Sequence, residues 1–311
     1  MTAPIAIFIY NRPDKLRRML CSLMACDGFN DRPVHVFGDG PKQGERSEGI
    51  SVTRSVAREM LGDRAVYHEA TFNKGLARSI IEGVDELTLN FGRVIVIEDD
   101  LELSPGFLSF MDQALDHYAN APNVMQVSGH VFDVPEFKDR NSALVLPLAT
   151  TWGWATWRRA WLRFDETASS ARRVLNSRLS RKAFNLGGIY DYASMLEDQL
   201  SGTRDSWGIR FYLSVFEENG VGIFPPRSLV RNSGFDGSGS HGRGWFRTFG
   251  VPEDSMWGPE LGRWSFPPAE TSQQDFDAVK RAIWKQNGGY LGQIVDVAKR
   301  ALKKFKQLAK Q

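Results

Sequence analysis

Three consecutive carboxylates, Glu98, Asp99 and Asp100, are the residues of this chain whose types and spacing best suit chemistry. They directly follow the apolar run 94–97, which predicts a strand buried on both faces. The acids would then lie at the carboxyl edge of an open α/β sheet, where ligands bind. Hard oxygen ligands on a short loop suit Mg²⁺ or Mn²⁺, and either cation suits a diphosphate. The alternative interpretation is a solvated acidic loop without a ligand.

The ends of other predicted strands also carry polar residues. Arg12 follows the first apolar run of the chain and Asp39 follows the second. An exposed arginine and an Asx-turn would explain each of them singly. Lys74 and Arg78 stand at the start of a predicted helix, where cations oppose the helix dipole. Their position therefore predicts an anion in front of that helix, such as a phosphate or a sugar acid.

Tryptophan is concentrated in one stretch, with Trp152, Trp154, Trp157 and Trp161 inside residues 152–161. Aromatic faces stack on the apolar faces of sugars, and indole N–H groups donate to hydroxyls. A carbohydrate platform and a core cluster are both consistent with this spacing. Further along, Asp205 begins another predicted helix, where a role as helix cap would by itself explain the residue.

Two segments near the end of the chain have distinctive compositions. The glycine-rich stretch 232–244 predicts a loop that a ligand must fix in place, because five glycines cannot pack a core. His241 in that loop is a candidate metal ligand, or simply an exposed histidine. The stretch 294–311 predicts a helix with an apolar face and a basic face, which suits an anionic membrane surface. A terminal helix docked on the domain is the alternative.

The composition is that of an ordinary globular protein of 311 residues, with 42% hydrophobic residues. Lys and Arg number 39 against 37 acids, and this near balance argues against a nucleic-acid partner. Cys21 and Cys26 are predicted to be free thiols in a reducing compartment. The run 4–10 is too short to span a bilayer and lacks a basic flank, so we expect a strand and a cytoplasmic protein.

The remaining pattern predicts the elements that position these residues. Strands at 5–10, 34–37, 65–68 and 94–97 alternate with helices, which predicts a mainly parallel, doubly wound α/β sheet. After a further strand at 124–127 this alternation stops. Later predictions are a helix that starts at Ser104 and Pro105, strands at 144–146 and 221–224, a helical region at 166–200 with Leu175, Leu179 and Phe184 buried, and two helices after residue 272.

Together these residues resemble a family: the metal-dependent nucleotide-sugar glycosyltransferases of the GT-A fold, specifically the bacterial relatives of N-acetylglucosaminyltransferase I. The order and spacing of the motifs carry the resemblance from Ile5 to about His241. The motifs are Tyr10-Asn11-Arg12-Pro13, Gly38-Asp39-Gly40-Pro41, Asn73-Lys74-Gly75-Leu76, Glu98-Asp99-Asp100, Trp152-Gly153-Trp154-Ala155-Thr156-Trp157, Asp205-Ser206-Trp207 and Asn232-Ser233-Gly234-Phe235.

The resemblance implies roles for individual residues. Asp100 would ligate Mn²⁺ or Mg²⁺, with His241 as a further candidate ligand, and Asp205 would be the general base. Gly208 stands where many relatives carry a second acid, which leaves Glu197 and Asp198 as substitutes for the base. For the donor, the resemblance implies that Arg12, Asp39, Glu98 and Asp99 bind the nucleotide sugar. From their position at a helix start we add Asn73, Lys74 and Arg78 to the expected donor site. From their aromatic faces we expect Trp152, Trp154, Trp157 and Trp207 to form the sugar platform.

The resemblance also implies an organisation and an activity. Residues 1–128 would bind the donor, 129–268 would hold the acceptor and catalytic residues, and 269–311 would form a C-terminal helical segment able to associate with a membrane. The expected reaction moves a sugar, with inversion, from a nucleotide diphosphate to a glycan or lipid-linked acceptor, and the expected nucleotide is UDP. It would serve cell-surface polysaccharide or glycolipid synthesis on the inner face of the cytoplasmic membrane.

Two other functions remain open at this stage. A nucleotidyltransferase acting on sugar phosphates would share the sheet, the acids and the metal. The segment 11–14 lacks the glycine-rich basic loop that such enzymes usually place after the first strand, which disfavours this reading. A non-catalytic glycan-binding protein would use the tryptophan cluster alone, so its glycan binding would not depend on Asp100 or on a metal.

Overall fold

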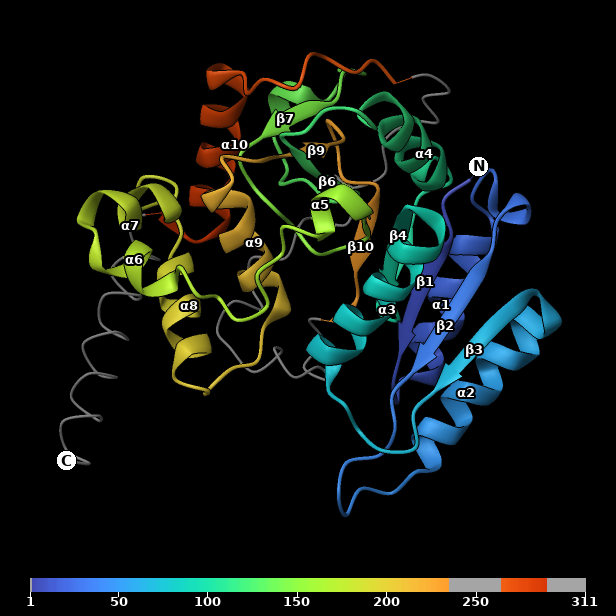
Figure 1. Ribbon diagram of the computed structural model, residues 1–311. Helices are drawn as coiled ribbons and strands as arrows, with labels where there is room; N and C mark the ends of the chain where they lie inside the picture. The colour runs from blue at the N-terminus through green and yellow to red at the C-terminus, as the bar shows by residue number, and fades with distance from the viewer. Residues whose placement is uncertain (1, 235–263, 290–311) are drawn as a thin grey trace, which may run out of the picture.

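A twisted sheet with helices on both faces forms the centre of the molecule (Figure 1), and the computed structural model describes residues 2–234 and 264–289. Within these residues the strand order of the eight-stranded sheet is β3-β2-β1-β4-β8-β6-β9-β7. Its strands are β1 (Ile5–Ile9), β2 (Val34–Gly38), β3 (Ala65–Glu69), β4 (Arg93–Glu98), β6 (Val124–Ser128), β7 (Leu144–Leu146), β8 (Trp154–Trp157) and β9 (Val221–Phe224).

The helices follow the predicted alternation through the first half of the chain and group together in the second half. None within the described residues is long and apolar enough to cross a membrane. They are α1 (Pro13–Met24), α2 (Glu48–Leu61), α3 (Leu76–Phe91), α4 (Phe107–His117), α5 (Arg158–Trp161), α6 (Ala171–Asn176), α7 (Arg178–Phe184), α8 (Tyr192–Leu200), α9 (Trp207–Glu217) and α10 (Gln273–Gln286).

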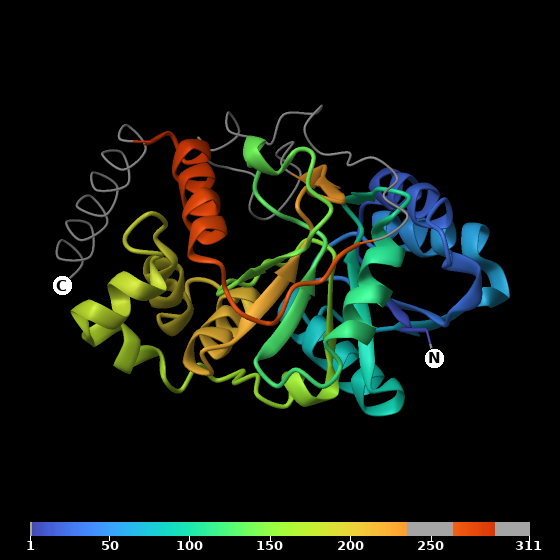
Figure 2. The same ribbon diagram turned by 90° about the horizontal axis from the view of Figure 1, so that it is seen from above.

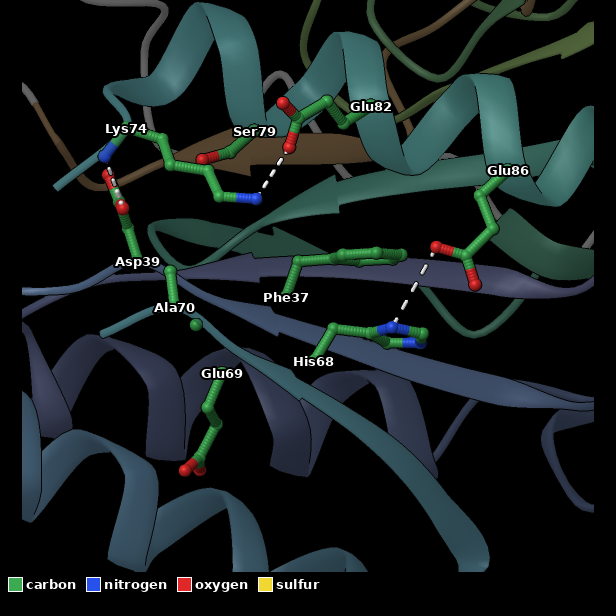
Figure 3. Close-up of a pocket in the computed structure, with 10 residues that line it drawn as sticks. Phe37, Asp39, His68, Glu69, Ala70, Lys74, Ser79, Glu82 and Glu86 are labelled. Atoms are coloured by element: carbon green, nitrogen blue, oxygen red, sulfur yellow. Dashed lines mark hydrogen bonds and ion pairs between the residues drawn. The ribbon is translucent and has the colours of Figure 1, made fainter. Parts of the chain in front are cut away.

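The first four strands of the sheet order, β3, β2, β1 and β4, are all parallel. The side chains of β1 are buried along its whole length, because α3 covers one face of the sheet and α1 and α2 cover the other (Figure 3). The strand pair β6 and β9 is parallel as well. The predicted α/β class, with a mainly parallel central sheet and flanking helices, is therefore confirmed.

Strand β8 was not anticipated from the sequence. It runs antiparallel between β4 and β6, with Trp154 opposite Val96 and Trp157 opposite Arg93. All four of its residues are buried. Part of the tryptophan cluster is therefore a central strand of the sheet.

A second, two-stranded sheet follows the acidic residues directly. Strand β5 (Leu101–Leu103) pairs antiparallel with β10 (Val230–Asn232). The helix expected to start at Ser104 and Pro105 begins instead at Phe107, because residues 101–103 are held in this ladder. The turn between β4 and β5 thus places Asp99 and Asp100 between the two sheets.

Two hydrophobic cores support this arrangement. The larger one fills both faces of the parallel strands, and a smaller one joins β7 to α6, α7, α8, α9 and α10. The helical region predicted for 166–200 is therefore three short helices. Phe184 is buried there as expected, but Leu179 is 83% exposed, so its assignment to the buried stripe is wrong. Figure 2 shows this helical group at one end of the molecule and the strands β1 to β3 at the other.

The C-terminal prediction is confirmed as far as the structure describes it. Helix α10 is the first of the two helices expected after residue 272, and the second lies outside the described residues.

Candidate functional site

The carboxylates at the end of β4 face a cation from the end of β1. Because β1 and β4 are parallel neighbours, Arg12 and the acidic turn meet at the same edge of the sheet. The Nη1 atom of Arg12 lies 2.7 Å from Oδ2 of Asp100 and 3.8 Å from Oδ1 of Asp99. The backbone N–H of Tyr10 donates to Asp99 at 3.3 Å. The sequence predicted polar groups at one common edge of the sheet, and Arg12 and the acidic turn do lie at that edge.

The surroundings of this cluster disfavour the charged forms of two of its acids. Burial raises the pKa of Glu98 to about 8, and the charges of Asp100 and Asp99 add to the shift. Burial and the charge of Asp100 likewise raise the pKa of Asp99 to about 7. The Arg12 guanidinium acts in the opposite direction on both acids but does not cancel these effects. A further positive charge would relieve the repulsion.

The segment after β10 packs directly on Asp100. The backbone N–H and the hydroxyl of Ser233 both donate to the carbonyl oxygen of Asp100, at 2.8 Å and 3.0 Å. Nζ of Lys15, a lysine that is only 7% exposed, donates to the carbonyl of Ser233 at 3.0 Å. At Gly234 a Cβ atom would stand 2.2 Å from Oδ2 of Asp100, so only glycine allows this close approach. Three elements, α1, β5 and β10, therefore fix the position of this acid.

Asp39 joins the end of β2 to the start of α3. Its carboxylate accepts hydrogen bonds from the backbone N–H groups of Gly40, Lys74 and Gly75 and from Nδ2 of Asn73, all between 2.8 Å and 3.0 Å. The residue is 8% exposed. The anion expected in front of this helix is thus present within the chain itself.

The two cations near the start of α3 share one carboxylate. Nζ of Lys74 lies 2.6 Å from Glu82, and Nε of Arg78 lies 2.7 Å from the same side chain. In the conformation described, neither cation points to an open anion site. A phosphate would have to compete with Glu82 for them.

A cavity of about 210 Å³ opens beside these residues, between α3 and the edge strand β3 (Figure 3). Its floor is the ring of Phe37 stacked on His68, with ring centroids 4.4 Å apart. This volume is below the roughly 300–1,000 Å³ of pockets that hold whole small-molecule ligands. It is lined by Phe37, Gly38, Asp39, His68, Glu69, Ala70, Lys74, Ser79, Glu82 and Glu86.

Most of the predicted tryptophan platform belongs to the core. Trp154 is completely buried and Trp157 and Trp207 are each 5% exposed, so their rings cannot stack on a sugar. The ring of Trp207 packs on Trp154 with centroids 4.9 Å apart, and the N–H of Trp157 donates to the carbonyl of Leu115. Assigning these three rings to an acceptor platform is therefore wrong. Trp152 alone of the four is partly exposed, and its ring lies 4.3 Å from that of His130.

Asp205 lies at the head of α9 but does not cap it. The cap is Ser206, whose hydroxyl accepts from the backbone N–H of Ile209 at 3.5 Å. The carboxylate of Asp205 is largely exposed and lies 2.8 Å from Nη2 of Arg210. Of the two substitutes, Glu197 is held by Arg181 at 2.6 Å. In Figure 1 the connection between α8 and α9 lies toward the same lower edge of the molecule as the ends of β1 and β2.

Other predicted site residues cannot be placed. His241 lies outside the described residues, as does the basic stretch 294–311. Within residues 2–234 and 264–289, no group of three or more His, Cys, Asp or Glu side chains is arranged to hold a metal ion. A metal bound at one or two of these carboxylates would complete its coordination shell with other oxygen ligands, such as water or phosphate.

Sequence reasoning overlooked two residues that shape this edge. Lys15 lies on the buried face of α1 with Leu16 and Met19. Its helical spacing from these apolar residues could have predicted that its ammonium group binds a partner inside the protein. Glu45 accepts hydrogen bonds from the hydroxyl of Tyr10 and from Nδ2 of Asn11. No sequence pattern predicted a role for Glu45, because it lies in an irregular loop.

The fold and this edge together define an α/β protein with an acidic site at the carboxyl end of a parallel sheet. No protein-family model matches the chain. Among solved structures, the chain is similar to GalNAc-T7 with UDP, GalNAc and Mn²⁺, at 10% identity and a TM-score of 0.49 over 74% of this chain and 43% of that one. It thus spans less than half of that protein.

A second similar structure is the mannosyltransferase PcManGT from Pyrobaculum calidifontis in complex with GDP-Man and Mn²⁺. The identity is 13% and the TM-score 0.39, over 69% of this chain and 68% of that one.

Proposed function

We propose that this protein is a metal-dependent glycosyltransferase that moves a sugar from a nucleotide diphosphate to a glycan or lipid-linked acceptor, with inversion. The observation that carries the proposal is the cluster of Glu98, Asp99 and Asp100 at the end of β4, facing Arg12 from the end of β1. UDP as the nucleotide, and surface polysaccharide or glycolipid synthesis as the pathway, rest on the resemblance of the sequence motifs.

A divalent cation fits Asp100. Burial first, and then the charges of the neighbouring acids, raise the pKa values of Glu98 and Asp99, and a bound dication would favour the charged forms of these carboxylates. Mg²⁺ is commonly held by one or two carboxylates together with substrate phosphates, so a site without three protein ligands is sufficient. When bound, the metal neutralises charge on the departing diphosphate.

The residues of the chain would perform the remaining tasks. Arg12 supplies a guanidinium at the acidic turn, and a guanidinium binds phosphate oxygens as well as carboxylates. Asp39 holds the loop of Asn73 and Lys74 in place and so shapes the wall of the donor site. Asp205 is the proposed general base: its exposed carboxylate can receive the proton of an acceptor hydroxyl.

Calorimetric titration with a panel of nucleotide sugars, with and without Mn²⁺, tests this proposal. We expect metal-dependent binding of one donor, followed by sugar transfer with inverted configuration when an acceptor is supplied. Metal-independent glycan binding without any nucleotide affinity would show a glycan-binding protein instead. Release of pyrophosphate from a nucleoside triphosphate and a sugar phosphate would show a nucleotidyltransferase.

A further inference from the structure

Helices α6 and α7 lie in a part of the chain with an unusual charge balance. Residues 167–190 contain five arginines and lysines and no aspartate or glutamate, whereas the whole chain has a net charge of only +2. The segment therefore concentrates positive charge on a protein that is otherwise nearly neutral. In Figures 1 and 2 these helices lie at the end of the molecule remote from β3.

Two of the five cations pair with carboxylates of neighbouring helices. Arg173 pairs with Glu217 of α9, and Arg181 lies 2.6 Å from Glu197 of α8. Within the described residues, Arg172, Arg178 and Lys182 are exposed and have no carboxylate partner. Their positive charge is directed to the solvent.

An exposed leucine lies among these charges. Arg178 and Lys182 are four residues apart in α7 and share one face of the helix, with Leu179 beside them. Leu179 is 83% exposed, more than any other large hydrophobic side chain in the described part of the chain. Phe184, at the end of α7, is buried in the smaller core.

We propose that the exposed side chains of these two neighbouring helices, here called the α6–α7 surface, dock the protein on an anionic membrane. They are Arg172 of α6 and Arg178, Leu179 and Lys182 of α7. The three cations would contact lipid phosphates and carboxylates, and Leu179 would enter the boundary between head groups and acyl chains. A lone aliphatic side chain would add nothing to binding on a nucleic-acid backbone, where aromatic side chains that stack on bases are the usual complement. None of these four residues belongs to the stretch 294–311, and the proposal does not depend on the proposed activity.

Vesicle flotation with the full chain tests the proposal. We expect binding to vesicles of phosphatidylcholine mixed with phosphatidylserine, little binding to phosphatidylcholine alone, and weakening by salt. Each basic residue near an anionic surface strengthens binding by roughly fivefold, so the triple variant Arg172→Gln, Arg178→Gln, Lys182→Gln should lower the partition coefficient about 100-fold. Leu179→Ser should lower it about tenfold, because a leucine side chain is no longer buried.

A matched control removes three positive charges at the other end of the molecule. Arg17, Arg18 and Arg58 are exposed on α1 and α2, and replacing all three by glutamine should leave the partition coefficient within a factor of two or so of the wild type. Circular dichroism and thermal melting would verify that every variant is folded. The proposal is overturned if the α6–α7 triple variant binds as tightly as the wild type while removal of residues 294–311 abolishes binding. It is also overturned if the wild type ignores anionic vesicles but binds an RNA oligonucleotide.

Discussion

Replacing Gly234 by alanine probes how closely the segment after β10 packs on the proposed metal ligand. A Cβ atom at position 234 would stand 2.2 Å from Oδ2 of Asp100 and 2.8 Å from Oδ1 of Asn232, whereas real Cβ atoms essentially never approach a neighbour within 3.0 Å. Atoms at such distances repel steeply, so the Asp100 carboxylate would have to move by roughly 1 Å. The added methyl group therefore acts on the site and not on the core.

The size of the expected effect follows from that displacement. A misplacement of about 1 Å at a reacting centre costs on the order of 10²-fold in rate, which corresponds to about 2.7 kcal/mol of transition-state stabilisation. We expect kcat/KM to fall by about this factor and metal-dependent nucleotide affinity to weaken with it. The fold should persist, because Asp100 lies in a turn between β4 and β5 and contributes no apolar surface to the core.

Turnover with the identified donor and calorimetric titration with nucleotide and Mn²⁺ would measure both effects. Gly106→Ala is the matched control: a Cβ atom there would lie 3.9 Å from its nearest neighbour, an ordinary contact, and the backbone of Gly106 is compatible with alanine. Wild-type turnover and nucleotide affinity in a folded Gly234→Ala variant would refute the reasoning. Equal losses in both glycine variants would also refute it.

Asp100→Asn should abolish metal-dependent nucleotide binding with little change in Tm; a titration that shows unchanged affinity would remove Asp100 from the site. Asp205→Asn should keep donor affinity, because the capping residue is untouched, while turnover falls by roughly 10²-fold. Near-normal turnover there, with a collapse in Glu197→Gln or Asp198→Asn, would move the base into α8. Burial lowers the pKa of His130 to about 3 in the folded protein, whereas the unfolded chain binds this proton below about pH 6.5. Stability should therefore fall as the pH drops from 6.5, by about 2 kcal/mol near pH 5. Urea denaturation should show His130→Gln losing less stability than the wild type between pH 7 and 5; equal losses would exclude a neutral buried imidazole.

Local patterns were enough to predict the parallel half of the sheet. The run before Glu98 is apolar on both faces because β4 is covered on both sides, and this burial is visible in the residue types alone. Arg12, Asp39 and the acidic turn were placed at one edge correctly, since parallel neighbours end on the same side. The predictions succeeded where one short segment contained the whole signal.

Long-range pairing caused the failures. The stretch Trp154–Trp157 forms a strand because it pairs on one side with β4 and on the other with β6, which both lie far from it in the sequence. The same pairing buries the rings that we expected to bind sugars. Likewise β5 exists only because β10 pairs with it across more than 120 residues, and no local pattern in Leu101–Leu103 indicates such a partner.

The antiparallel direction of β8 determines which connecting segment of the chain lies next to the acidic turn. Parallel strands bring their last residues to this edge, but an antiparallel strand brings its first, so Trp152 arrives beside the end of β4 from the opposite chain direction. Insertions before β8 would therefore lengthen a loop at the proposed site, whereas insertions after Trp157 would alter only the far edge of the sheet. In the proposed enzyme, the segment 147–153 would thus be free to change in length and sequence while the strands that carry the acids remain unchanged.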